Sequence, residues 1–118
     1  MAKFLFVLSR GLEDPTRAVR CFQFAKLAKE EGHEVVVFLI DDGAVFARLG
    51  AAEQVKAPTG DELKPYLDYL VEHETPILVC TPCANSRLLD PAEFVPGARL
   101  ETGKTLIALA QDHQVFTF

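Results

Sequence analysis

Apolar and polar positions along the chain predict alternating strands and helices. Nearly continuous apolar runs, typical of strands covered on both faces, occupy Lys3–Ser9, His33–Ile40 and Pro76–Cys80, and a terminal strand is predicted at Gln114–Phe118. Helices are predicted between them at Pro15–Glu31, around Leu63–Val71, at Pro82–Leu89 and near Thr102–Asp112. This alternation predicts an α/β fold: a three-layer sandwich with a mostly parallel sheet of about five strands.

The first helix has clear boundaries and a broad apolar face. Asp14 is a suitable N-cap, Pro15 suits the first helical position, and Gly32 ends the helix. Phe24 and Leu27 widen its apolar face beyond the stripe that one sheet needs. The helix therefore indicates contacts between subunits.

The remaining segments have weaker patterns. A short helical piece is predicted at Val45–Leu49, an exposed connection at 50–60 and irregular structure at 90–99. Thr59 and Glu62 suit a capping box for the helix around Leu63–Val71, although Pro65 would then cost an internal hydrogen bond.

Length and composition narrow the class of protein. The 118 residues form one domain, 1–118, and the net charge of −5 argues against a nucleic-acid-binding protein. No run approaches the roughly 20 apolar residues of a membrane span, and we interpret the initial MAKFLFVLSR as a buried strand rather than a signal peptide. Three cysteines lack the density of a disulfide scaffold, which favours a reducing cytoplasm.

Three loops follow the carboxyl ends of predicted strands, where parallel sheets bind ligands: 9–14, 41–46 and 80–87. The candidate substrate-binding residues on them are Ser9, Gly11, Asp42, Gly43 and Thr81. Asp41 and Asp42 suit acid or base chemistry or a helix cap, and we favour the cap.

The third loop carries the candidate catalytic residues Cys80, Cys83 and Arg87 in the segment CTPCANSR. With Thr81 as N-cap and Pro82 as first helical residue, Cys83 falls in the first turn, where backbone N–H groups and the helix dipole lower a thiol pKa. Arg87 lies one turn later and would support the anion, while Cys80 lies within reach of the same amides. The alternative is that both cysteines only pack, as we expect for Cys21 on the apolar face of the first helix.

Metal and nucleotide sites are not predicted, and no cofactor is expected. One CxxC stands alone, with His33, His73 and His113 scattered, whereas structural zinc takes four ligands. The segment ARLETGKT, 98–105, nearly matches a phosphate-binding loop but lacks its first glycine and a preceding apolar strand. Gly103-Lys104-Thr105 is better explained as the start of the last helix.

The glycine-bearing loop after the first strand, the segments FLIDDGAVFA and CTPCANSR, and the terminal QVFTF together resemble the DsrE/DsrF-like family. The resemblance implies a parallel α/β sheet, trimers or hexamers, and in some members a persulfide on one cysteine. Counting back from Arg87, it favours Cys80 as the active thiol, whereas the helix-dipole argument favours Cys83, and both remain open. The chain departs from the family pattern at Leu88, where many relatives have glycine, and at the turn Asp90-Pro91.

The sequence supports three alternative functions. The leading hypothesis is a sulfur-handling protein, a sulfurtransferase or sulfur carrier that takes a sulfane sulfur from a donor protein and relays it to an acceptor protein's thiol. The second is thiol–disulfide exchange through Cys80 and Cys83. The third is a non-enzymatic oligomeric module that binds a ligand or partner through the same loops.

Overall fold

Five strands form one sheet in which every neighbouring pair is parallel. The computed structural model describes residues 1–118, and the strand order is β4-β3-β2-β1-β5. The strands are β1 (Lys3–Leu8), β2 (Glu34–Leu39), β3 (Ile77–Cys80), β4 (Ala98–Glu101) and β5 (Gln114–Thr117). The predicted parallel α/β sandwich is confirmed.

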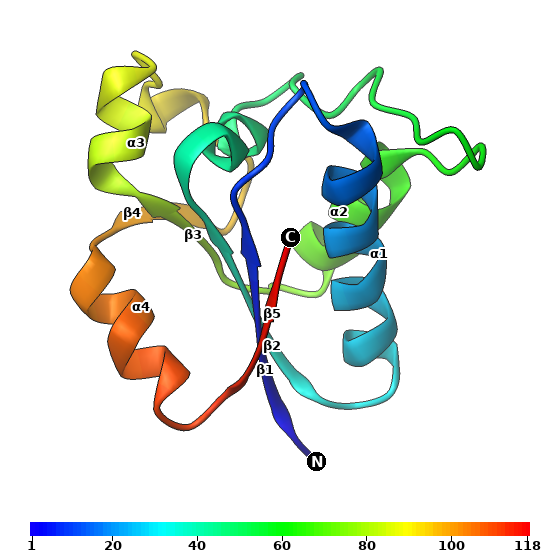
Figure 1. Ribbon diagram of the computed structural model, residues 1–118, viewed down its shortest axis with the longest axis vertical. Helices are drawn as coiled ribbons and strands as arrows, with labels where there is room; N and C mark the ends of the chain where they lie inside the picture. The colour runs from blue at the N-terminus through cyan, green and yellow to red at the C-terminus, as the bar shows by residue number, and fades with distance from the viewer.

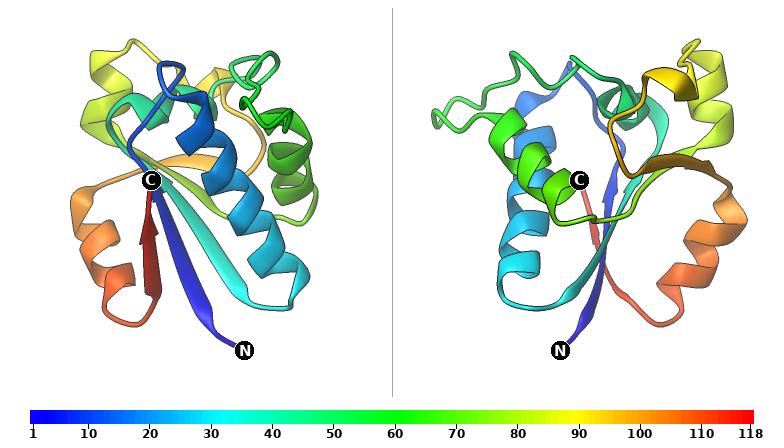
Figure 2. Two further views of the ribbon diagram at one scale, coloured as in Figure 1. Left: turned by 45° about the vertical axis from the view of Figure 1, so that its right-hand side comes forward. Right: turned by 180° about the vertical axis from the view of Figure 1, so that it is seen from behind.

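Helices cover both faces of this sheet, which gives three layers (Figures 1 and 2). The helices are α1 (Pro15–Glu30), α2 (Leu63–Glu72), α3 (Thr81–Ser86) and α4 (Gly103–Ala110), with 3-10 helices η1 (Asp41–Ala47) and η2 (Pro91–Glu93). The chain adds β2, β3 and β4 in one direction and then returns to place β5 beside β1. Because such crossovers are right-handed, the return helix α4 lies on the face opposite α1 and α2.

The core is divided unequally by the sheet. A cluster of 24 buried residues fills the α1 and α2 side, whereas four buried residues, Leu5, Val7, Phe38 and Leu78, lie on the other side against α4. Both faces of β1, β2 and β3 are thus covered, in agreement with their continuous apolar runs. No helix has the length and apolar character needed to cross a membrane.

Several local predictions differ from the structure. β4 overlaps the end of the segment 90–99 that was expected to be irregular, so a strand does lead into Gly103, which begins α4 as predicted. The connection at 50–60 is only partly exposed, since three of its side chains are buried: Ala52, Val55 and Ala57.

The start of α2 also differs. No capping box forms, because Glu62 is the N-cap without a side-chain hydrogen bond and the Thr59 hydroxyl bonds to Asp61 instead. Pro65 then lies in the first turn of α2, where its missing N–H has no helical acceptor to lose.

Candidate functional site

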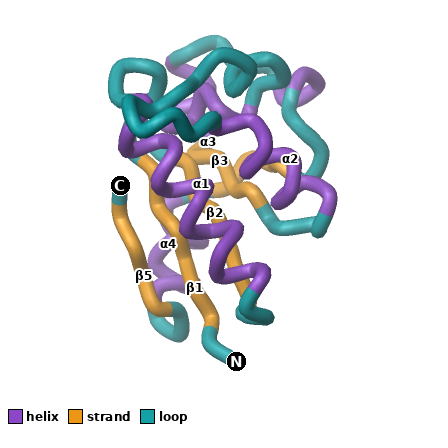
Figure 3. Tube along the Cα trace, turned by 90° about the vertical axis from the view of Figure 1, so that its right-hand side faces the viewer, coloured by secondary structure: helices purple, strands orange, loops and turns teal.

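The three predicted loops meet at the carboxyl edge of the sheet, where most of the long loops gather (Figure 3). The helix after β3 packs through Ala84 on the larger core cluster, whereas the helix after β4 packs through Leu106 on the smaller one. The chain therefore leaves the neighbouring strands β3 and β4 toward opposite faces, which is the condition for a ligand crevice in such sheets.

Two glycines allow the loops to approach one another closely. A Cβ on Gly11 would lie 2.5 Å from the Asp42 carbonyl oxygen, and a Cβ on Gly43 would overlap the Leu8 carbonyl oxygen. Glu13 closes the first loop by accepting a hydrogen bond of 2.6 Å from the Gly11 N–H. Both glycines are thus required by packing, and neither has positive φ.

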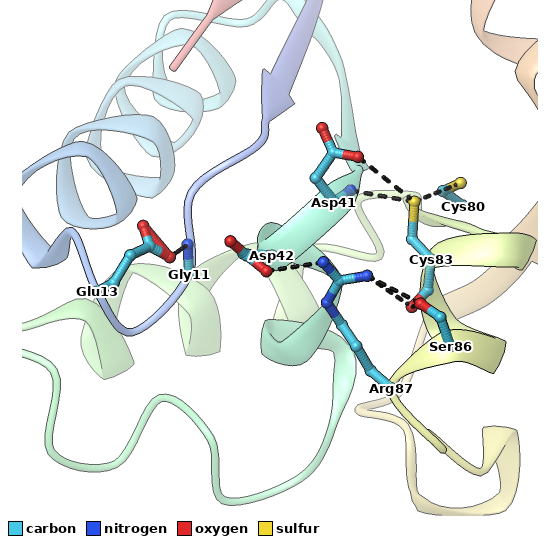
Figure 4. Close-up of polar contacts among 8 residues, drawn as sticks. All are labelled: Gly11, Glu13, Asp41, Asp42, Cys80, Cys83, Ser86 and Arg87. Atoms are coloured by element: carbon cyan, nitrogen blue, oxygen red, sulfur yellow. Dashed lines mark hydrogen bonds and ion pairs between the residues drawn. The ribbon is translucent and has the colours of Figure 1, made fainter.

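The centre of the site is a pair of free cysteines (Figure 4). Cys80 is the last residue of β3 and the N-cap of α3, and Cys83 lies in the first turn of that helix. Their Sγ atoms are 2.7 Å apart, with the Cys83 thiol as donor. Both side chains are half-buried, so the pair is neither sealed in the core nor fully in solvent.

Asp41 bounds the pair on the side of η1. Its backbone N–H donates a hydrogen bond of 3.1 Å to Cys83 Sγ, and its Oδ1 lies 3.9 Å from the same sulfur. Asp41 has φ of 50°, in the left-handed region that Asp tolerates better than most residues. This backbone conformation places the N–H group next to the sulfur.

The thiol of Cys83 is less acidic than the sequence predicted. Burial and the hydrogen bond to Cys80 raise the pKa of Cys83, and the nearby Asp41 carboxylate adds to the increase. The Asp41 N–H acts in the opposite direction but does not outweigh them. The prediction that the helix start lowers the pKa of Cys83 was therefore wrong, because burial and the neighbouring Cys80 thiol outweigh the backbone N–H.

Arg87 is also placed differently from the prediction. Its guanidinium donates to Asp42 Oδ1 at 2.7 Å, to the Cys83 carbonyl oxygen at 3.1 Å and to Ser86 Oγ at 3.1 Å. Figure 4 shows the guanidinium directed at these oxygens, and no dashed line joins it to either sulfur atom. The cation joins α3 to η1 and so positions the thiols, instead of bonding to a sulfur.

The other candidate residues have structural partners. Thr81 is the first residue of α3, not its N-cap, and its hydroxyl donates to the Glu101 carbonyl oxygen of β4 at 2.8 Å. The hydroxyl of Ser9 donates to the Phe118 carbonyl oxygen at 2.9 Å, which fixes the chain end beside β1. Asp41 and Asp42 do not act as caps either, since η1 has Ile40 as its N-cap and no side-chain cap.

Three features of the site were not predicted from the sequence. They are the Asp41 N–H donor, the Ser86 hydroxyl, which donates to the Cys83 carbonyl oxygen, and Glu101, which pairs with Cys80 in the sheet register. For the Asp41 N–H, the only signal in the sequence was the pair of aspartates at the end of a buried strand. Its backbone angle cannot be predicted from the residue types alone.

Cys21 is separate from the site. It is fully buried in α1, and burial strongly raises its pKa, as expected of a core cysteine. No group of three or more His, Cys, Asp or Glu side chains is placed to hold a metal ion.

The fold and the site define a class: a small parallel α/β protein with two contacting thiols at the carboxyl edge of its sheet. The chain belongs to the DsrE/DsrF-like family, whose model matches residues 2–118. Two similar proteins are uncharacterized: MK0008 of Methanopyrus kandleri is 32% identical over 86% of this chain and 80% of its own, and MJ0989 of Methanocaldococcus jannaschii is 31% identical over 98% and 99%.

Solved structures agree with the fold. The ychN protein of E. coli has a TM-score of 0.84 and 19% identity, and both chains are covered completely. The protein of unknown function MTH1491 of Methanobacterium thermoautotrophicum has a TM-score of 0.73 and 10% identity, again over both whole chains. At these identities the likeness concerns the architecture alone.

Proposed function

We propose that this protein is a sulfurtransferase or sulfur carrier that accepts a sulfane sulfur on Cys80 as a persulfide and passes it to the thiol of an acceptor protein. The observation that carries the proposal is the contact of 2.7 Å between Cys80 Sγ and Cys83 Sγ in a half-buried position. A DsrE/DsrF-like fold with these thiols at its ligand-binding edge supports the same chemistry.

Cys80 is assigned as the acceptor because Cys83 has a raised pKa and so keeps its proton. The protonated Cys83 thiol, with its Sγ 2.7 Å from Cys80 Sγ, is placed to donate a hydrogen bond to a sulfur that attacks from Cys80. The Cys80 thiolate attacks the sulfane sulfur, the S–S bond of the donor breaks, and the departing donor sulfur takes the electron pair. This assignment agrees with the residue that the family resemblance favours.

Transfer reverses these steps on a second protein. A thiolate of the acceptor attacks the outer sulfur of the persulfide, and Cys80 leaves as a thiolate that the Cys83 thiol again stabilises. Because thiol chemistry of this kind needs free cysteines, we place the protein in a reducing cytoplasm.

The proposal includes assembly of the chain with copies of itself, as a trimer or hexamer. An apolar surface supports this part: Phe24 and Leu27 of α1 and Phe116 of β5 are 42%, 48% and 44% exposed. These side chains border one hollow, and β5 is an edge strand with one side unpaired.

The test is persulfide formation. The reduced protein is incubated with inorganic polysulfide and separated from excess reagent, and its intact mass is measured by mass spectrometry. Cys83→Ser should gain the mass of one sulfur atom and lose it to a reductant, whereas Cys80→Ser should gain none. An unmodified Cys83→Ser protein, or equal modification of the two variants, would contradict the assignment.

A further inference from the structure

The second thiol is not needed to carry a sulfur atom. One cysteine is sufficient to form a persulfide and to yield it to an acceptor. Cys83 nevertheless lies with its Sγ 2.7 Å from Cys80 Sγ, nearer than two sulfur atoms in ordinary non-bonded contact. A thiol in this position will meet any persulfide that forms on Cys80.

We propose that Cys83 is a resolving thiol, so that the protein reduces the bound sulfur to hydrosulfide whenever no acceptor thiol removes it. This inference rests on the proposed function and adds a second product to it. The Cys83 sulfur attacks Cys80 Sγ, the inner sulfur of the persulfide. A Cys80–Cys83 disulfide forms, the bond to the outer sulfur breaks, and the outer sulfur leaves with the electron pair.

The step balances in atoms, protons and electrons. A persulfide anion and one thiol become a disulfide and HS⁻, and the thiol proton ends on the departing sulfur. The sulfane sulfur is reduced to sulfide by two electrons, which come from the two cysteine sulfurs. A second turnover therefore needs a small dithiol or a dithiol protein as reductant, to which the half-buried pair is open.

The distance between the thiols favours this reaction. A disulfide has an S–S length of about 2.04 Å, so the sulfurs need to approach by less than about 1 Å. Cys80 and Cys83 belong to one strand–helix junction, and no domain movement has to bring them together. Two groups held in contact react far faster than the same groups free in solution.

Asp41 supplies the two groups that the attacking sulfur requires. Its N–H, 3.1 Å from Cys83 Sγ, stabilises the thiolate that forms as the proton leaves. Its carboxylate, with Oδ1 3.9 Å from the same sulfur, is placed to receive the proton and return it to the departing sulfide. Asp41 is thus a positioning and proton-carrying residue for Cys83, while the Arg87–Asp42 ion pair fixes the helix against η1.

The experiment measures hydrosulfide and protein mass together after a single loading. Reduced protein is loaded with one equivalent of inorganic polysulfide and freed at once of the spent reagent, and the hydrosulfide released afterwards and the intact mass are followed over time. The wild type should release about one hydrosulfide per loaded chain and lose the mass of two hydrogen atoms. Cys83→Ser and Cys83→Ala should keep the added sulfur, with release slowed at least about tenfold.

Two further variants separate the causes. Cys21→Ala also removes one cysteine but lies in the core, so it should release hydrosulfide like the wild type. Asp41→Asn keeps a residue that tolerates positive φ while removing the carboxylate, so it should slow release severalfold and alter its pH profile.

The outcomes distinguish this inference from the proposed function. A wild type that holds its added sulfur without releasing hydrosulfide overturns the resolving role but leaves Cys80 as a sulfur acceptor. Release at the same rate from Cys83→Ser also overturns it. Absence of any added sulfur in Cys83→Ser contradicts the proposed function itself.

Discussion

At the scale of single residues, the side chain of Leu88 destabilises the folded state. It has φ of 57° and is 92% exposed, so its Cβ is strained and its apolar surface makes little contact. The left-handed conformation destabilises the folded state by about 1–2 kcal/mol for a residue other than glycine. Glycine avoids this strain, but it loses more conformational entropy on folding, so the net gain is smaller. Glycine would adopt this conformation without strain.

Leu88→Gly should therefore raise the free energy of unfolding by about 0.5–1 kcal/mol. Leu88→Ala is the matched control, because it removes the exposed side chain and keeps the strained backbone. Urea denaturation of the two variants measures the difference. If glycine is no more stabilising than alanine, the left-handed conformation is not the cause.

The raised pKa of Cys83 has a consequence for its reactivity. Burial and the bond to Cys80 keep this thiol protonated, so less thiolate is present at neutral pH than for a free cysteine with a pKa of about 8.5. Alkylation of Cys83 by iodoacetamide should be slow at pH 7, should rise with pH, and should reach its plateau only above the pKa of about 8.5 of a free cysteine. Peptide mapping over a pH series tests this, and a rate that reaches its plateau below pH 8 would contradict it.

At the scale of elements, the site depends on how closely η1 approaches β1. Gly43 lies against the Leu8 carbonyl oxygen, and an added Cβ would force the two segments apart. Gly43→Ala should destabilise the protein by about 1–3 kcal/mol and displace the Asp41 N–H from Cys83. Chemical denaturation and the alkylation rate of Cys83 should both change.

Gly103→Ala is the control for this substitution. A Cβ at Gly103 meets nothing within 4 Å, and its position at the start of α4 favours alanine slightly. Its stability should be unchanged or slightly increased. An equal loss of stability in the two variants would show that crowding at Gly43 is not the cause of the destabilisation.

The elements also show what the sequence could predict. β1, β2 and β3 were predicted within two residues at each end because both of their faces are covered and their apolar runs are continuous. β4 was missed because it is an edge strand with the sequence ARLE, whose charged side chains remain partly exposed. Its hydrogen bonds to β3, not an apolar pattern, make it a strand.

The site was predicted in position but not in detail. Parallel topology brings loops at the carboxyl ends together, so the proximity of Asp41 and Cys83 followed from the order of elements. The partner of Arg87 could not be predicted in this way. A carboxylate and two sulfur atoms are all candidate partners for one guanidinium, and side-chain geometry decides between them. The prediction of a lowered pKa for Cys83 was wrong because local burial, which the sequence does not reveal, opposes the helix dipole.

At the scale of the whole molecule, the β5 edge of the sheet is exposed whereas the central strands are buried. Every residue of β5 is exposed, and Leu27 of α1 borders the same apolar hollow. We expect the wild type to have a native mass several times that of one chain, and Leu27→Glu to reduce it by placing a charge in the contact. Light scattering after gel filtration measures both.

Ile107→Glu is the matched control, because Ile107 is 65% exposed on α4, on the opposite face of the sheet. Its native mass should equal that of the wild type. A wild type that remains a single chain at all concentrations, or equal effects of the two charges, would contradict assembly through the hollow beside β5.

In the proposed function, a sulfur atom from a donor becomes bonded to Cys80. The most direct measurement uses polysulfide enriched in a heavy sulfur isotope, followed by fragmentation of labelled Cys83→Ser in the mass spectrometer. We expect one heavy sulfur atom on Cys80 and none on Cys21, which is fully buried in the core. Heavy sulfur absent from Cys80, in a folded protein whose Cys80 reacts with other thiol reagents, would contradict it.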